Sequence, residues 1–172
     1  CGYSEVHDVV AVAEWAHTRF CMDGTEKAKK MWLVAQSAGG PSAGTALSKL
    51  DRGVCQGIVY IGYTFGCATS VLFGRHFRHA RRLPFPETQR SLFIMGTNDC
   101  FTTEWTLRRA LARANHASGI YLIKDAGHFE IEQPHYDDVF SSILIEFANN
   151  GIQGVETGPD GPGHVLRTMP GK

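Results

Sequence analysis

The chain has 172 residues, of which 43% are hydrophobic, and its 17 basic side chains balance 17 acidic ones. This length and composition are typical of one globular domain with its own core, and they exclude a disordered chain. The balanced charge gives no reason to expect a nucleic-acid or membrane-surface partner, and no apolar run approaches the ~20 residues that span a bilayer.

The first expected element is a helix over residues 4–20. Ser4 can cap this helix, and Glu5 adds negative charge to its first turn. Its apolar residues recur at helical spacing, namely Val6, Val9, Val10, Ala13, Ala16 and Phe20. Because the chain begins with Cys1 and opens almost directly on this helix, we expect it to be the C-terminal portion of a longer protein.

The most distinctive run leads through five apolar residues, 31–35, into Ser37, and a helix-compatible stretch follows at 39–50. This pattern predicts a strand, a sharp turn and a helix, with the serine at the apex. Such a turn exposes the serine oxygen to a base and aims the next amide N–H groups at a developing oxyanion. Ala35 and Gly39 supply the small neighbours that the turn needs, although the usual G-x-S-x-G pattern has glycine at both positions. The alternative is an ordinary turn between a strand and a helix.

A second apolar strand is expected over residues 57–62. The segment after it, 63–89, is short and mixed, with one helix-like stretch at 69–79. A large lid domain would need more chain, so any pocket near Ser37 is expected to be only partly covered. Aromatic residues of this segment, Tyr63, Phe65 and Phe73, are candidates to line it, and core or loop packing is the alternative.

Two later strands each end in a polar loop. The strand over residues 91–96 runs into Asp99, on the edge where open parallel sheets build their sites. The alternative is that Asp99 caps the helix expected over 103–115. The strand over 119–123 runs into a loop that carries His128, and the alternative there is a surface histidine.

A last helix is expected over residues 134–149, followed by a tail, 151–172, that is rich in Gly and Pro and has no periodicity. Strands that alternate with helices in this way predict a parallel sheet with helices on both faces. We therefore expect the α/β class, a three-layer α/β/α sandwich with a mostly parallel sheet of about four strands. The domain is assigned to residues 1–150 and a flexible tail to 151–172.

Neither the charge clusters nor the cysteines indicate a metal or a macromolecular partner. The basic cluster over residues 75–82 can bind an anion, but a solvated helix end is its commoner role, so we expect no nucleic-acid partner. The five cysteines are odd in number and widely spaced, without a C-x-x-C pair. This spacing argues against a structural zinc site and favours reduced thiols in an intracellular, cytoplasmic protein.

With Ser37, Asp99 and His128 in this order, each after a separate strand, the chain resembles the α/β-hydrolase superfamily over about residues 2–149. It is most similar to the small serine hydrolases without a large lid, the dienelactone-hydrolase-like and esterase-like members. The resemblance implies that Ser37 is the nucleophile, His128 the general base and acid, and Asp99 the residue that orients the imidazole. It also implies one oxyanion-hole amide, that of Ala38. The family's second amide comes from a loop after an earlier strand. These 172 residues do not contain that loop.

These residues favour a serine hydrolase that cleaves an ester, thioester or amide bond of a small acyl substrate, without a metal or other cofactor. Gln36 and Phe129, which adjoin the expected nucleophile and base, join Tyr63 and Phe65 as candidate pocket residues. Asp99 is preferred to Asp125 as the acid because Asp125 lies in the same loop as the histidine. The alternative function is a catalytically inactive binding protein of the same fold, or an incomplete fragment. The substrate and the oligomeric state stay open.

Overall fold

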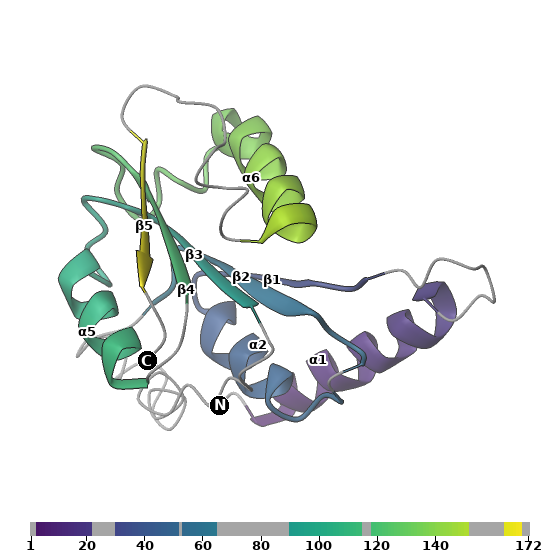
Figure 1. Cartoon of the computed structure of the whole chain (residues 1–172). Helices are drawn as coiled ribbons and strands as arrows, with labels where there is room; N and C mark the ends of the chain where they lie inside the picture. Colours follow the sequence, from purple (N-terminus) through teal and green to yellow (C-terminus); the bar gives the residue numbers. More distant parts are fainter. Residues whose placement is uncertain are drawn as a thin grey trace.

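The computed structural model describes residues 3–21, 30–51, 53–64, 90–114, 118–151 and 164–169. The helix expected over 69–79, the residues Phe65 and Phe73, and the basic cluster 75–82 lie outside these ranges. The elements in chain order are α1 (Tyr3–Ala16), the π-helical turn η1 (His17–Cys21), β1 (Leu33–Gln36), α2 (Gly39–Leu47), β2 (Gly57–Ile61), β3 (Arg90–Gly96), α5 (Glu104–Ala114), β4 (Ser118–Ile123), the 3-10 turn η3 (Pro134–Tyr136), α6 (Asp137–Asn150) and β5 (His164–Met169) (Figure 1).

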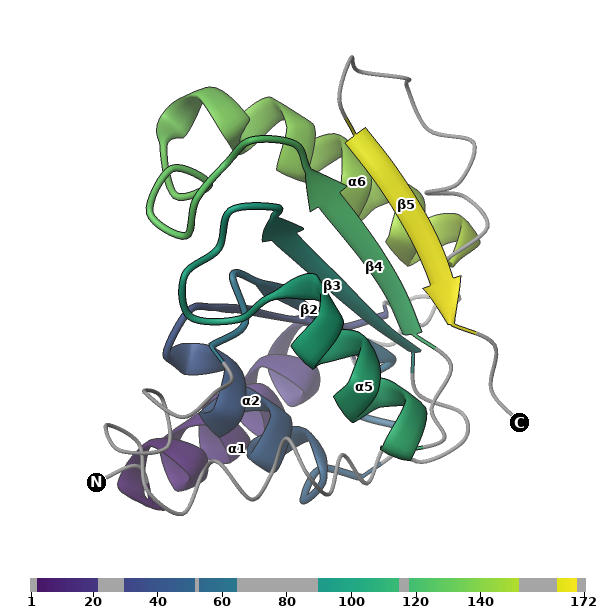
Figure 2. The ribbon, with the colours of Figure 1, turned by 90° about the vertical axis from the view of Figure 1, so that its left-hand side faces the viewer.

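The described strands form one sheet in the order β1-β2-β3-β4-β5. The first four strands are parallel, and β5 is antiparallel to β4. In Figure 2 the arrowheads of β3 and β4 point to the same edge of the sheet, while the yellow β5 points the other way. The predicted α/β class and mostly parallel sheet are therefore confirmed, and the four predicted strands match the observed ones to within two residues at each end.

Helices cover both faces of the sheet, and the strand register decides which residues face each layer. Side chains alternate between the two faces of a strand, so residues aligned across the sheet share a face. One aligned row packs with residues of α1, α2 and α5, and it consists of Ala35, Tyr60, Phe93 and Ile120. The next row packs with α6, and it consists of Ile61, Ile94 and Tyr121. The three-layer sandwich follows, and among the described α-helices α6 lies on the face opposite α1, α2 and α5 (Figure 1).

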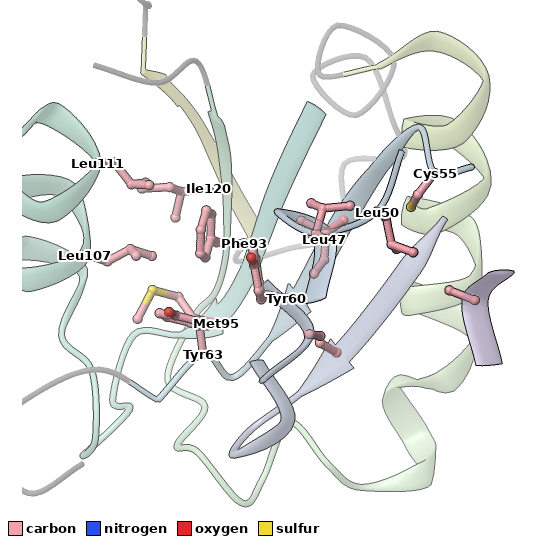
Figure 3. Packing of buried hydrophobic residues seen from close by; sticks show 14 of the residues in the cluster. Leu47, Leu50, Cys55, Tyr60, Tyr63, Phe93, Met95, Leu107, Leu111 and Ile120 are labelled. Atoms are coloured by element: carbon pink, nitrogen blue, oxygen red, sulfur yellow. The ribbon is translucent and has the colours of Figure 1, made fainter. Parts of the chain in front are cut away.

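An aromatic cluster fills the centre of the face that α2 and α5 cover. The rings of Tyr60 and Phe93 stack with centroids 4.6 Å apart, and Tyr63 packs edge-on against Phe93 at 5.5 Å (Figure 3). The start of α2 lies directly on this cluster, since a Cβ built at Gly40 would come within 2.6 Å of Tyr63 Cδ2. Only glycine leaves room there, so the close approach sets the position of α2 relative to β2.

The C-terminal tail differs from the sequence prediction in one segment. A flexible tail is expected over residues 151–172, but His164–Met169 forms β5 and adds a fifth strand to the sheet. Without β5, the outer edge of β4 would leave its backbone N–H and C=O groups unpaired in the described sheet. Hydrogen bonding to that edge is a long-range stabilisation, which overrides the weak local signal of the tail.

The first helix packs along α2 and buries Val6 and Ala13. Phe20, which the helical spacing places on the same apolar face, is instead exposed in η1, where its ring meets Trp15 edge-on at 5.6 Å. The change to π-helical hydrogen bonding after Ala16 rotates the following residues away from the α-helical face. Among the described helices, none is long and apolar enough to cross a bilayer.

Candidate active site

Ser37 lies at the apex of the turn between β1 and α2, with its backbone in the left-handed region at a φ of 47°. This backbone conformation is unfavourable for serine, and it persists only where surrounding contacts hold it in place. Backbone hydrogen bonds do so here: the Ser37 N–H donates to the Ile61 carbonyl at 2.8 Å, and the Gly40 N–H donates to the Ser37 carbonyl at 3.0 Å. The serine side chain is thereby held beyond the end of the strand, half-buried.

Ala38 follows as the N-cap of α2 and is exposed. The first amide N–H groups of a helix have no partner within the helix, and they point towards its N-terminal end. The Ala38 amide therefore belongs to the group of donors that a helix start presents next to Ser37. This is the position from which a backbone N–H can bind an oxyanion formed at the serine.

The structure brings Ser37, His128 and Asp99 together in one chain of hydrogen bonds. Ser37 Oγ lies 2.8 Å from His128 Nε2, and His128 Nδ1 lies 2.8 Å from Asp99 Oδ2. The histidine and the aspartate are buried, with 2% and 4% of their surfaces exposed. When Asp99 is a carboxylate it accepts the Nδ1–H, so Nε2 is left as an acceptor for the serine O–H.

The second oxygen of Asp99 holds the carboxyl group in place. Asp99 Oδ1 accepts the backbone N–H of Phe101 at 2.8 Å and that of Thr102 at 2.9 Å. The helix that follows has its own cap, since Thr103 Oγ1 accepts the Thr106 N–H at 3.2 Å. Asp99 therefore does not cap α5, and its Oδ2 atom is directed at the histidine.

The geometry also distinguishes the surroundings of His128 from those of Asp125. His128 is not a surface histidine, because it is buried and its ring lies against Gly62 at the end of β2. Asp125 is exposed, with its backbone at a φ of 60°, and its N–H donates to Thr97 Oγ1 at 2.9 Å. The carboxyl group that reaches the imidazole is that of Asp99.

Gly62 and two phenylalanines surround the imidazole. Gly62 has a φ of 58°, and a Cβ built there would come within 3.1 Å of His128 Cε1. The rings of Phe101 and Phe129 meet the imidazole edge-on, with centroids 4.6 Å and 5.2 Å away. The histidine ring is thus held between a bare backbone at the end of β2 and two aromatic side chains.

The candidate pocket residues differ in location and exposure. Tyr63 is a core residue, which corrects the expectation that it lines the pocket, and burial raises the pKa of its hydroxyl well above the usual range. Gln36 and Phe129 are exposed beside Ser37 and His128, and Phe65 lies outside the described residues. The direction of Tyr63 depends on the left-handed turn at Gly62, which the residue pattern does not reveal.

Phe101, Gly62 and Thr64 are site neighbours that the sequence interpretation misses. Thr64 is buried, and its hydroxyl donates to the Ser37 carbonyl at 3.4 Å. The only signals for the other two were a glycine at the end of a predicted strand and an aromatic residue two positions after Asp99. Both are common next to loops, so neither could single out these residues.

The described residues contain no group of three or more His, Cys, Asp or Glu side chains arranged to hold a metal ion. The described cysteines, Cys21, Cys55 and Cys100, are not in disulfide bonds. Burial raises the pKa of the Cys55 thiol, which keeps it protonated and unreactive. Cys100 is exposed next to Asp99, but the hydrogen-bonded chain from Asp99 runs to the histidine and the serine, not to the thiol.

No protein-family model and no curated protein matches the chain. Solved structures do match. An esterase of Pyrococcus furiosus, Pf2001, is 15% identical over 83% of this chain and 60% of its own, with a TM-score of 0.59. A puromycin-hydrolyzing peptidase of Mycobacterium tuberculosis is 17% identical over 93% of this chain and 26% of its own, with a TM-score of 0.60.

An α/β-hydrolase enzyme from the metagenome of lagoon sediments of Mar Chica, Morocco, is 18% identical over 81% of this chain and 69% of its own, with a TM-score of 0.52. Identities this low show the fold alone. The chain therefore has part of the α/β-hydrolase fold, and it spans 60% and 26% of the lengths of the esterase and the peptidase.

Proposed function

We propose that this chain carries the catalytic residues of a serine hydrolase, which cleaves an ester, thioester or amide bond of a small-molecule substrate through an acyl-enzyme. One observation carries the proposal, namely the unbroken hydrogen-bonded chain from Ser37 through His128 to Asp99. The strained backbone at Ser37 supports it, since strain of this kind clusters at functional sites. The fold supports it as well, because Ser37 occupies the strand-to-helix turn that exposes a nucleophile in α/β hydrolases.

Acylation begins when Ser37 Oγ attacks the substrate carbonyl carbon while His128 Nε2 takes the hydroxyl proton. The carbonyl oxygen becomes an oxyanion and accepts the Ala38 N–H, which is one of the two amide donors that this family uses. Asp99 holds the imidazole in the tautomer whose Nε2 is free, and it stabilises the imidazolium that forms. The bond to the leaving group then breaks, and the leaving group takes the proton from Nε2.

Deacylation repeats these steps with water. His128 Nε2 removes a proton from water, the hydroxide oxygen attacks the acyl carbon, and the bond to Ser37 Oγ breaks. Oγ takes the proton back from the imidazolium, and the carboxylic acid leaves. The three side chains that this sequence needs already form one hydrogen-bonded chain.

A fluorophosphonate probe tests the proposal, because it labels only an activated serine. We expect the wild-type protein to be labelled, Ser37→Ala to lose labelling and ester hydrolysis, and circular dichroism to show that the variant stays folded. The matched control is Ser141→Ala, an exposed serine on α6 that should keep full labelling. A folded wild-type protein that is never labelled, or a Ser37→Ala variant that still hydrolyses p-nitrophenyl esters, would contradict the proposal and favour a binding protein of the same fold.

A further inference from the structure

Three aromatic rings meet at the outer side of the site. Phe101, His128 and Phe129 contact one another edge-on, with Phe101 and Phe129 centroids 5.9 Å apart at an interplanar angle of 85°. Phe101 is half-buried, whereas Phe129 is 63% exposed. A large apolar side chain is thus left in water directly beside the imidazole.

The exposed ring is presented by an ordered turn. Glu130 Oε2 accepts the Gly127 N–H at 2.5 Å, and the Ile131 N–H donates to the Gly127 carbonyl at 3.3 Å. Ile131 itself is buried in the core cluster under α6, which anchors the turn from below. The backbone of Phe129 is therefore held between two anchored positions, and its ring stands at a defined place next to His128.

The chemistry of the site says which part of a substrate meets this surface. After attack the acyl group is bonded to Ser37 Oγ, while the leaving group must receive a proton from His128 Nε2. A leaving group has to lie within hydrogen-bond reach of Nε2 at that moment. An exposed side chain that contacts the imidazole ring can therefore also contact the leaving group, whereas the acyl group is bonded to the serine.

We propose that Phe101 and Phe129 form a leaving-group subsite that selects esters of apolar alcohols, aromatic ones above all. This proposal rests on the proposed serine hydrolase function and names its substrate class. The edge-to-face geometry already present among the three rings can extend to a fourth ring supplied by the alcohol. Burial of Phe129 against that ring removes apolar surface of both partners from water, which a polar alcohol cannot match.

Two acetate esters test the proposal on the whole chain. Benzyl acetate and 2-methoxyethyl acetate release alcohols of similar acidity and give the same acetyl-enzyme, so their kcat/KM ratio reports the alcohol alone. We expect the wild-type protein to favour the benzyl ester, and Phe129→Ala to lower that preference about tenfold. Phe129→Leu, which keeps an apolar side chain, should retain most of the preference.

The controls separate the subsite from general damage. Ile145→Ala removes another exposed apolar side chain, on α6, and should leave the ratio unchanged. The ratio of benzyl butyrate to benzyl acetate hydrolysis should also stay the same in Phe129→Ala, because the acyl group does not lie on the histidine side.

Failure of this proposal differs from failure of the proposed function. A protein that is labelled by fluorophosphonate but keeps its alcohol preference in Phe129→Ala would overturn the subsite alone. The same holds for a variant in which only the acyl preference changes. A protein that is neither labelled nor active on any ester would overturn both proposals.

Discussion

The inner strands β2 and β4 and the edge strand β1 bury their side chains to very different extents. Every residue of β2 and β4 is buried, whereas in β1 only Ala35 is buried and Val34 is 52% exposed. Among the described residues, β1 has a strand partner on one side only. Yet the site includes residues from both regions, since Asp99 and His128 follow the inner strands β3 and β4 and Ser37 follows the edge strand β1.

The difference shows that two kinds of support hold the site. His128 and Asp99 are buried at the ends of inner strands, and two backbone N–H groups also hold the Asp99 carboxyl group. The nucleophile is held by hydrogen bonds across to the neighbouring strand, above all from the Ser37 N–H to the Ile61 carbonyl. Changes in the inner region should therefore affect both stability and catalysis, and changes at the exposed positions of β1 should affect stability little.

The largest effect is expected from Asp99→Asn, which breaks the buried part of the site. The amide would keep the loop contacts but favour the wrong imidazole tautomer, and turnover of an ester should fall by about four orders of magnitude. Asp125→Asn is the matched control, because Asp125 is exposed and asparagine tolerates its left-handed backbone. Steady-state kinetics would contradict the assignment if Asp125→Asn lost turnover and Asp99→Asn kept it.

Gly62→Ala tests the inner region at a single contact. The new Cβ would come within 3.1 Å of His128 Cε1 and of Ile131 Cδ1, and the φ of 58° is unfavourable for alanine. Displacement of the imidazole should lower kcat by roughly 10- to 100-fold with little change in KM. Gly53→Ala is the control, since a Cβ there meets nothing within 4 Å. An unchanged kcat in Gly62→Ala would show that the imidazole does not depend on this support.

Much of this arrangement could be predicted from local patterns, and the failures have a common cause. The apolar runs before Ser37, Asp99 and His128 revealed the strands, and a parallel sheet brings the ends of such strands to one edge. The positions of Tyr63 and Phe101 could not be predicted, because the direction of each side chain depends on the conformation of a turn. The first turn has a left-handed glycine, and the second is closed by two amides that donate to Asp99.

The strand β5 shows a second feature that the sequence pattern did not predict. Its residues, His164–Met169, follow a stretch rich in glycine and proline, and local propensity there favours a flexible chain. Its pairing with β4 comes from hydrogen bonds to a strand more than 40 residues earlier in the sequence. Tertiary contacts of this kind override weak local preferences, and for this reason the glycine- and proline-rich pattern of the tail did not predict the fifth strand.

A pair of valines measures the difference between the regions directly. Val34 on β1 and Val59 on β2 are register partners, but Val59 is 1% exposed. Val59→Ala should lower the free energy of unfolding by about 2 kcal/mol, because it removes two buried methyl groups and leaves a cavity. Val34→Ala should change it by less than about 0.5 kcal/mol. Urea unfolding measures both, and equal losses would show that β1 is as buried in solution as β2.

The smallest effect is expected at Thr64, whose buried hydroxyl donates to the Ser37 carbonyl at 3.4 Å. The Ser37 carbonyl also accepts the Gly40 N–H at 3.0 Å, so the long hydroxyl contact is the weaker of its two bonds. Thr64→Val keeps the shape and removes the hydroxyl, and it should cost about 1 kcal/mol of stability and no more than about fivefold in kcat/KM. Thr64→Ser keeps the hydroxyl and should lose less activity than Thr64→Val. If Thr64→Val instead cost a hundredfold while Thr64→Ser stayed active, the loop after β2, rather than the backbone bond to Ile61, would be the main support of the nucleophile.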